Sequence, residues 1–181
     1  MTPQEARKIL DEADLLVSAN ESAAAVRRVA GEIGQRLSDS NPLVLAVMGG
    51  AVVFTGQLLP QLGFPLDFDY LHVTRYGDVT HGGKLQWIVE PRAPVAGRVV
   101  LVLDDILDEG VTLAAIAERL LTQGASEVLC AVFADKNLGR AKPIAADFVG
   151  VQLPNRYVFG YGMDVKGAWR NLPAVYAVKG M

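Results

Sequence analysis

The chain has 181 residues, of which 51% are hydrophobic, and this is enough for a single domain with a packed core. Its net charge of −3 gives no reason to expect a nucleic-acid partner. The lone Cys130 allows neither an internal disulfide nor a zinc cluster, the N-terminus is too polar for a signal peptide, and no apolar run approaches a membrane span. We therefore expect a cytoplasmic protein that contacts neither nucleic acid nor membrane.

Apolar runs alternate with helical patterns, which predicts an α/β fold with a largely parallel sheet. An amphipathic helix is expected from about Ser18 to Leu37. Gly49–Gly50 lies between a strand and a second helix through Val53 and Leu59. The expected strands are, in chain order, Leu43–Val47, Leu66–Val73, Leu85–Val89, Val99–Leu103 and Val128–Ala134. A helix from Thr112 is expected to end at Gly124, with one apolar face formed by Leu113, Ile116, Leu120 and Leu121.

Two segments depart from this alternation. Arg75–Lys84 is polar and Gly-rich and lies between two expected strands, so it is either a mobile loop or an ordinary hairpin connection. From Asp147 onward, short apolar pieces are broken by Pro, Asn and Gly residues. This pattern favours short strands and loops over a further βαβ unit.

The stretch Val99–Thr112 reads VVLVLDDILDEGVT and is the most informative part of the chain for predicting a ligand site. Five apolar residues lead into the adjacent carboxylates of Asp104 and Asp105, and a third carboxylate, Asp108, follows. Such a run suits a strand buried on both faces of a parallel sheet, where ligands bind beyond the carboxyl end. The helix that opens next can bind a phosphate through its free N–H groups. The alternative is a buried strand followed by an acidic turn.

This stretch resembles the phosphoribosyl-diphosphate signature of the type I phosphoribosyltransferases. The family pattern is an apolar strand, two acidic residues, two apolar residues, Asp, Thr, Gly, any residue and Thr, and the chain departs from it at Glu109. The resemblance implies one phosphoribosyltransferase domain over residues 1–181. It also implies a mostly parallel central sheet flanked by helices, with a small hood built from the N-terminal part and roughly residues 147–181.

Three later pieces resemble the hypoxanthine-guanine phosphoribosyltransferases. They are AVFADKN over residues 131–137, DFVGVQLPNRYVFGYGMD over 147–164 and WRNL over 169–172. With Gly49–Gly50 and Arg75–Tyr76, the resemblance extends across most of the chain beyond about residue 40. It implies purine salvage, in which hypoxanthine or guanine and 5-phosphoribosyl 1-diphosphate give IMP or GMP and pyrophosphate.

The resemblance also implies a Mg²⁺ site. Asp104 and Asp105 match the acidic pair near the ribose hydroxyls and the metal, and Asp164 matches a second metal-associated carboxylate. Mg²⁺ is a hard ion that suits carboxylate and diphosphate oxygens. The residues expected to bind phosphoribosyl diphosphate are Gly49, Gly50, Arg75, Tyr76, Asp104, Asp105, Glu109, Gly110, Val111, Thr112 and Arg170.

Asp108 matches the general base that takes the proton from purine N7, and from the residues alone a helix-capping role is the alternative. Glu109–Thr112 matches the loop that binds the 5′-phosphate through backbone N–H groups and the Thr hydroxyl. A carboxylate facing a phosphate would repel it, so the side chain of Glu109 is expected to point outward.

Lys136, Tyr157 and Val158 match the purine-binding residues. The lysine would contact the 6-oxo group, and an ammonium donates but cannot accept, so an oxo group is favoured over an amino group. Tyr157 matches an aromatic residue that stacks on the purine, and Val158 a backbone contact to its edge. Ordinary strand packing and a solvated lysine are the alternatives. Arg75–Lys84 resembles the family's closing loop.

The second interpretation is an enzyme of the same family that prefers xanthine or guanine. Contacts at purine C2 would distinguish it from the first. A non-catalytic regulator that senses phosphoribosyl diphosphate is a third reading, but it would need an added basic, nucleic-acid-binding region. The expected partners are therefore phosphoribosyl diphosphate, a 6-oxopurine, and further copies of the chain in a dimer or tetramer.

Overall fold

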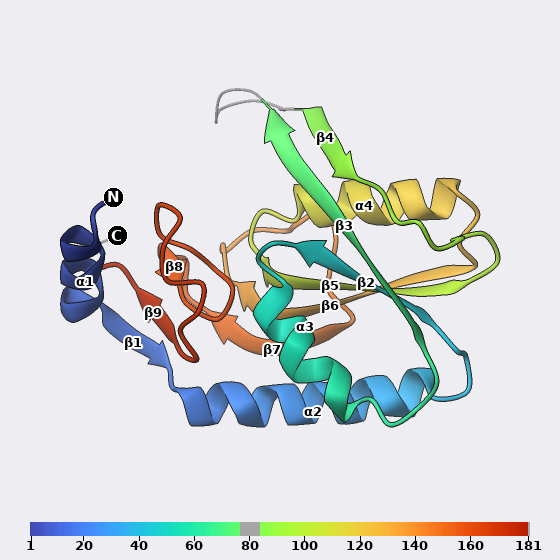
Figure 1. Cartoon of the computed structure of the whole chain (residues 1–181), viewed down its shortest axis with the longest axis horizontal. Coiled ribbons are helices and arrows are strands. Elements are labelled where there is room, and N and C mark those ends of the chain that lie inside the picture. Colours follow the sequence, from blue (N-terminus) through green and yellow to red (C-terminus); the bar gives the residue numbers. More distant parts are fainter. Residues whose placement is uncertain (77–83, 181) are drawn as a thin grey trace.

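The computed structural model describes residues 1–76 and 84–180, and of residues 75, 76 and 84 it describes only the backbone. Its main sheet has six strands in the order β4-β3-β2-β5-β6-β7 (Figure 1). They are β2 (Leu43–Met48), β3 (Asp67–Tyr76), β4 (Lys84–Val89), β5 (Val99–Leu107), β6 (Glu127–Lys136) and β7 (Phe148–Leu153). All neighbours are parallel except the antiparallel pair β3 and β4. The expected α/β fold with a mostly parallel sheet is confirmed.

Helices cover both faces of this sheet (Figure 1). The helices α2 (Ala19–Leu37) and α3 (Val52–Leu58) pack on one face, with a short 3₁₀ turn at Leu59–Gln61, and α4 (Val111–Thr122) packs on the other. In β5, Leu101 and Leu103 belong to the cluster with α2 and α3, whereas Val100 and Val102 belong to the cluster with α4. Burial on both faces explains why this strand is apolar without interruption.

A second sheet of three strands, in the order β1-β9-β8, lies at one end of the molecule, beside α1 (Pro3–Glu12) (Figure 1). Its strands are β1 (Asp14–Val17), β8 (Val158–Phe159) and β9 (Val175–Ala177), all antiparallel. The indole Nε1 of Trp169 donates to the carbonyl of Ala6 at 2.8 Å and ties the first helix to the C-terminal part. The expected hood boundary near residue 147 is too early, because β7 pairs with β6 in the main sheet.

The two central strands are longer than their apolar runs. The parallel pairing of β5 with β6 continues from Leu103 opposite Ala131 to Leu107 opposite Asp135. Asp104 and Asp105 therefore lie within β5, and the expectation that they follow its end is wrong. Backbone pairing with a neighbouring strand outweighs the low strand propensity of aspartate.

The helix after this strand begins at Val111, one residue earlier than expected. Leu113, Ile116 and Leu120 are buried, but Leu121 is 52% exposed, so it does not belong to the apolar face. The expectation of a closing loop over Arg75–Lys84 lies largely outside the described residues.

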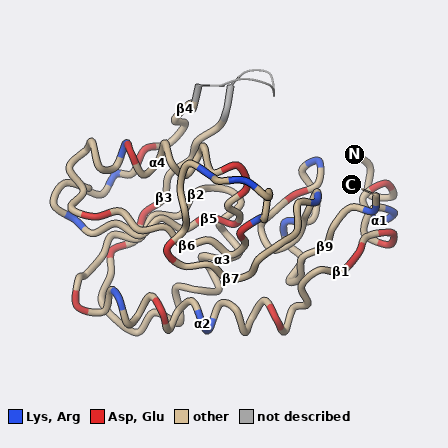
Figure 2. Tube along the Cα trace, turned by 180° about the vertical axis from the view of Figure 1, so that it is seen from behind, with Lys and Arg blue, Asp and Glu red and all other residues tan. Residues whose placement is uncertain are grey.

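Acidic and basic residues are interspersed along the trace and are not segregated into separate regions in this view (Figure 2). Across the described parts of the chain, no helix is both long enough and apolar enough to cross a membrane.

Candidate active site

Residues from β5, β6 and the C-terminal loops line one cavity of about 180 Å³. Asp105 and Asp108 come from β5 and the turn after it, and Lys136 is the last residue of β6. The lining residues are Asp105, Ile106, Asp108, Lys136, Tyr157, Val158, Met163, Asp164 and Arg170. The cavity lies where the parallel strands β5 and β6 end, which is the usual place for a ligand site in such a sheet.

Asp108 and Lys136 form an ion pair within this cavity. Lys136 Nζ lies 2.7 Å from Asp108 Oδ2, and the lysine side chain is 9% exposed, whereas that of Asp108 is 46% exposed. The alternative of a solvated lysine is therefore wrong. Gly110 is the N-cap of α4 and provides no side-chain bond, and Asp108 bonds to Lys136 instead, so the capping role is not seen either. A carboxylate acceptor and an ammonium donor stand side by side.

The acidic pair in β5 holds its protons unusually strongly. Burial raises the pKa of Asp104 well above its usual range, and the neighbouring Asp105 carboxylate raises it further. Burial also raises the pKa of Asp105, although hydrogen bonds with Asp104 and Ile106 and the charge of Arg170 oppose this. A bound cation would favour the ionised form of both carboxylates.

A second cavity of about 140 Å³ lies at the N-terminus of α4. Asp104, Asp108, Glu109, Gly110 and Thr112 are among its lining residues. The first-turn N–H groups of a helix have no partners within the helix, and the helix dipole favours an anion there. This end of α4 is thus suited to a phosphate, as the sequence predicts.

The carboxylate of Glu109 forms an ion pair with the guanidinium of Arg140. The two side chains are 46% and 64% exposed. The only residue in the signature that departs from the family pattern is therefore matched by a cation from the loop after β6. Arg140 thus offsets the negative charge that Glu109 adds to the turn between β5 and α4.

The loop after β8 is fixed by polar bonds and by a close backbone contact. Arg170 donates to the Gly162 carbonyl at 2.7 Å and pairs with Asp164 at 2.5 Å. A Cβ on Gly162, whose φ is +101°, would lie 2.1 Å from the Gly50 carbonyl oxygen. A Cβ on Gly50 would lie 2.1 Å from Asp105 Oδ2. Only glycines allow this loop, the turn after β2 and the acidic pair to meet.

The structure brings most of the predicted site residues to the two cavities. Gly50 also belongs to the site, because it packs directly against the Asp105 carboxylate. Val111, at the start of α4, is 51% exposed and is not among the residues that line either cavity. Gly49 follows β2, and its peptide bond with Met48 is cis. The side chains of Arg75 and Tyr76 lie outside the described residues. Tyr157 is 42% exposed and Val158 is buried in β8.

Sequence reasoning missed Arg140 and Gly162. Arg140 lies in an irregular loop 31 residues from Glu109, where no periodic pattern places a side chain. Gly162 had a visible signal, because Gly160 and Gly162 flank Tyr161 within the quoted C-terminal motif. Closely spaced glycines often mark a close backbone approach.

Comparisons with known proteins identify the family of this chain. A family model described as a phosphoribosyl transferase domain matches residues 13–166. The chain is 32% identical over 166 residues to the hypoxanthine-guanine phosphoribosyltransferase of Bacillus subtilis, and the match covers 91% of this chain and 92% of that protein.

It is 36% identical over 166 residues to the bifunctional protein TilS/HprT of Listeria monocytogenes, but the match spans only 26% of that protein's length. A solved structure of a hypoxanthine-guanine-xanthine phosphoribosyltransferase has a TM-score of 0.85 and 29% identity, covering 93% of this chain and 99% of that one. The chain therefore belongs to the phosphoribosyltransferase family, within its hypoxanthine-guanine branch.

Proposed function

We propose that this chain catalyses purine salvage, joining hypoxanthine or guanine to the ribose C1 of 5-phosphoribosyl 1-diphosphate and releasing pyrophosphate. The observation that carries this proposal is the Asp108–Lys136 pair, which lines one cavity with Tyr157 and Arg170. Asp108 also lines the second cavity, at the N-terminus of α4 that suits a phosphate. The products are IMP or GMP.

Asp108 and Lys136 match the edge of a 6-oxopurine. That edge presents the oxo oxygen, an acceptor, beside the N7–H group, a donor. Lys136 can donate to the oxygen while Asp108 accepts the N7 proton, so the purine exchanges one ion pair for two charge-assisted hydrogen bonds. Adenine presents an amino donor to the ammonium and loses one of these bonds.

Other residues of the site have distinct proposed roles. The N-terminus of α4 and the Glu109–Thr112 loop bind the 5′-phosphate. Arg170 and the glycines after β2 contact the leaving pyrophosphate, and Tyr157 stacks on the purine. As the purine N9 to C1 bond forms and the C1 to pyrophosphate bond breaks, positive charge develops on the ribose. The carboxylates of Asp104 and Asp105 stabilise this charge.

The acidic pair fits a Mg²⁺ ion that is shared with the substrate. No three His, Cys, Asp or Glu side chains of the described segments form a metal site of their own. Mg²⁺ is commonly held by one or two carboxylates plus substrate phosphate oxygens, and it keeps several waters. Asp104 and Asp105 are the residues that would hold it with the diphosphate, and Asp164 would support it from the facing loop. When bound, the ion neutralises charge on the departing pyrophosphate.

A panel of purines tests this function. Pyrophosphate release is followed with hypoxanthine, guanine, xanthine and adenine in the presence of phosphoribosyl diphosphate and Mg²⁺. We expect turnover with hypoxanthine and guanine and little with adenine. A kcat/KM for adenine equal to that for hypoxanthine would contradict both the Lys136 role and the proposed function. Xanthine is included because a similar solved structure is named for all three 6-oxopurines.

Two further features belong to this proposal. A reducing cytoplasmic location suits the single Cys130, which is buried and whose thiol pKa burial raises to about 12.

A homo-oligomer would cover Phe68 and Ile88, apolar residues of β3 and β4 that are 45% and 50% exposed. Sedimentation of the purified chain would test the second feature, and a monomer at micromolar concentration would contradict it.

A further inference from the structure

Lys142, a largely shielded lysine outside the catalytic pair, bridges β5 and β6, the two strands that position Asp108 and Lys136. Lys142 Nζ donates to the Leu107 carbonyl at 2.6 Å and to Asp135 Oδ1 at 2.5 Å. Its side chain is 11% exposed. Leu107 directly precedes Asp108, and Asp135 directly precedes Lys136.

This bridge lies where the backbone pairing stops. Leu107 opposite Asp135 is the last paired position of β5 and β6. Beyond it, the only described bond between the two strand ends is the ion pair of Asp108 and Lys136 itself, which a purine must replace. Something else has to hold the two strand ends in place when that pair is exchanged for a substrate.

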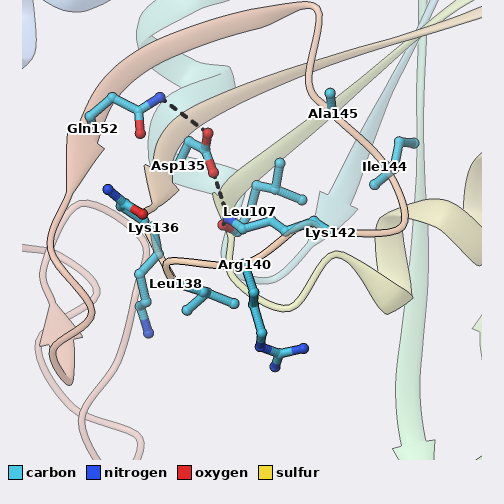
Figure 3. Close-up of a pocket in the computed structure, with 10 residues that line it drawn as sticks. Leu107, Asp135, Lys136, Leu138, Arg140, Lys142, Ile144, Ala145 and Gln152 are labelled. Atoms are coloured by element: carbon cyan, nitrogen blue, oxygen red, sulfur yellow. Dashed lines mark hydrogen bonds and ion pairs between the residues drawn. The ribbon is translucent and has the colours of Figure 1, made fainter.

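We propose that Lys142 is a positioning residue that holds Asp108 and Lys136 at the spacing required by the purine edge. This inference rests on the proposed function. The other polar contact of Asp135 supports it, because Gln152 Nε2 of the neighbouring strand β7 donates to Asp135 Oδ2 at 3.1 Å. The Asp135 carboxylate is thus held on both sides, and Lys136 extends away from it (Figure 3).

The same cluster is poorly suited to a ligand of its own. Lys142 lines a cavity of about 290 Å³ with Arg140 and Asp135. The charge of Lys142 is already matched by Asp135, and that of Arg140 by Glu109. The charges of this cluster are therefore paired within the protein. Lys142 acts on the site through the backbone carbonyl of Leu107 and the side chain of Asp135.

Replacing Lys142 by methionine tests this role, because methionine is close to the unbranched aliphatic part of lysine in length and lacks the ammonium donors. We expect kcat with hypoxanthine to fall about 10- to 100-fold, as for a catalytic group displaced by about 1 Å. The Kd of phosphoribosyl diphosphate alone should stay within about twofold, because the phosphate loop does not use this bridge. Lys142→Arg retains the donors and should recover most of the lost kcat.

Arg98→Met is the matched control at the opposite end of the sheet. Arg98 also donates to a carbonyl, that of Asn41, and pairs with Asp67 at 2.8 Å, with 24% of its side chain exposed. Both variants should lose stability in urea unfolding, but Arg98→Met should retain the kcat of the parent chain. A merely structural role predicts the same kcat for both folded variants, and this result would overturn the proposal.

Asp135→Asn gives a second test that does not depend on the folding of Lys142→Met. It keeps the shape and one acceptor oxygen but removes the charge that holds Lys142. We expect a several-fold lower kcat with unchanged affinity for phosphoribosyl diphosphate, and an unchanged kcat would refute the proposal. Failure of the proposed function is recognised separately, because the parent chain itself would then turn over no 6-oxopurine.

Discussion

Removing Arg140 should weaken the binding of phosphoribosyl diphosphate without removing any direct substrate contact. Glu109 belongs to the loop proposed to bind the 5′-phosphate, and its carboxylate pairs with Arg140. In Arg140→Ala, that carboxylate is left uncompensated beside the phosphate. The substrate then meets an extra negative charge.

The expected size follows from the exposure of the pair. At a separation of about 6 Å, two unit charges interact by about 0.7 kcal/mol at the dielectric of water and about 2.8 kcal/mol at an effective dielectric of 20. Glu109 is 46% exposed, so we expect a value near the lower limit. A repulsion of about 0.7 kcal/mol corresponds to a Kd about threefold higher.

Titration calorimetry of phosphoribosyl diphosphate in the presence of Mg²⁺ would measure this Kd. The double variant Glu109→Thr with Arg140→Ala should bind nearly as well as the single variant Glu109→Thr, because there is no carboxylate left to neutralise. Arg36→Ala, which removes another exposed ion pair, with Glu127, is the control and should not change the Kd. An equal loss on removing Arg140 in both backgrounds would refute the neutralising role and point to direct contact with the substrate.

Three other predictions follow from the site. Asp108→Asn should lower kcat by about 10²–10⁴-fold while phosphoribosyl diphosphate still binds, and near-normal turnover would exclude the base role. The folded chain binds protons at Asp104 and Asp105 more tightly than the unfolded chain, whose carboxyl pKa is near 3.8, so the stability of the ligand-free protein should fall as pH rises above about 4. Asp104→Asn should flatten that fall in urea unfolding at stepwise pH, and an unaltered slope would contradict this. Gly162→Ala should cost about 2–4 kcal/mol because of its positive φ and its contact with Gly50, whereas Gly31→Ala, exposed within α2 and free of contacts, should be neutral or stabilising.

Periodic patterns predicted the main elements of the fold because each buries a large apolar face. The uninterrupted apolar run of β5 required burial on both faces, and the structure supplies α2 and α3 on one side and α4 on the other. The same patterns placed the strand ends too early. Local propensity stops β5 at Leu103, whereas pairing with β6 extends it to Leu107.

The sequence placed Asp108 and Lys136 shortly after two expected strands but could not show that they touch. That contact depends on β5 and β6 being neighbours in register, which is a property of the sheet and not of either segment. Arg140 and Lys142 are a harder case. Both lie in the irregular loop between β6 and β7, where the path of the backbone decides which carboxylate each cation meets.

The position of the acidic pair within β5 has a physical consequence for the site. Carboxylates at the free end of a strand would be solvated, and their pKa would stay near the usual range. Inside the strand, Asp104 and Asp105 are partly buried and held by the backbone, and burial penalises their charged forms. Ionising this pair in the folded protein is therefore unfavourable, and a cation and a developing positive ribose both offset that cost. The feature that lowers the stability of the ligand-free chain at neutral pH is thus the one that strengthens its interaction with the transition state.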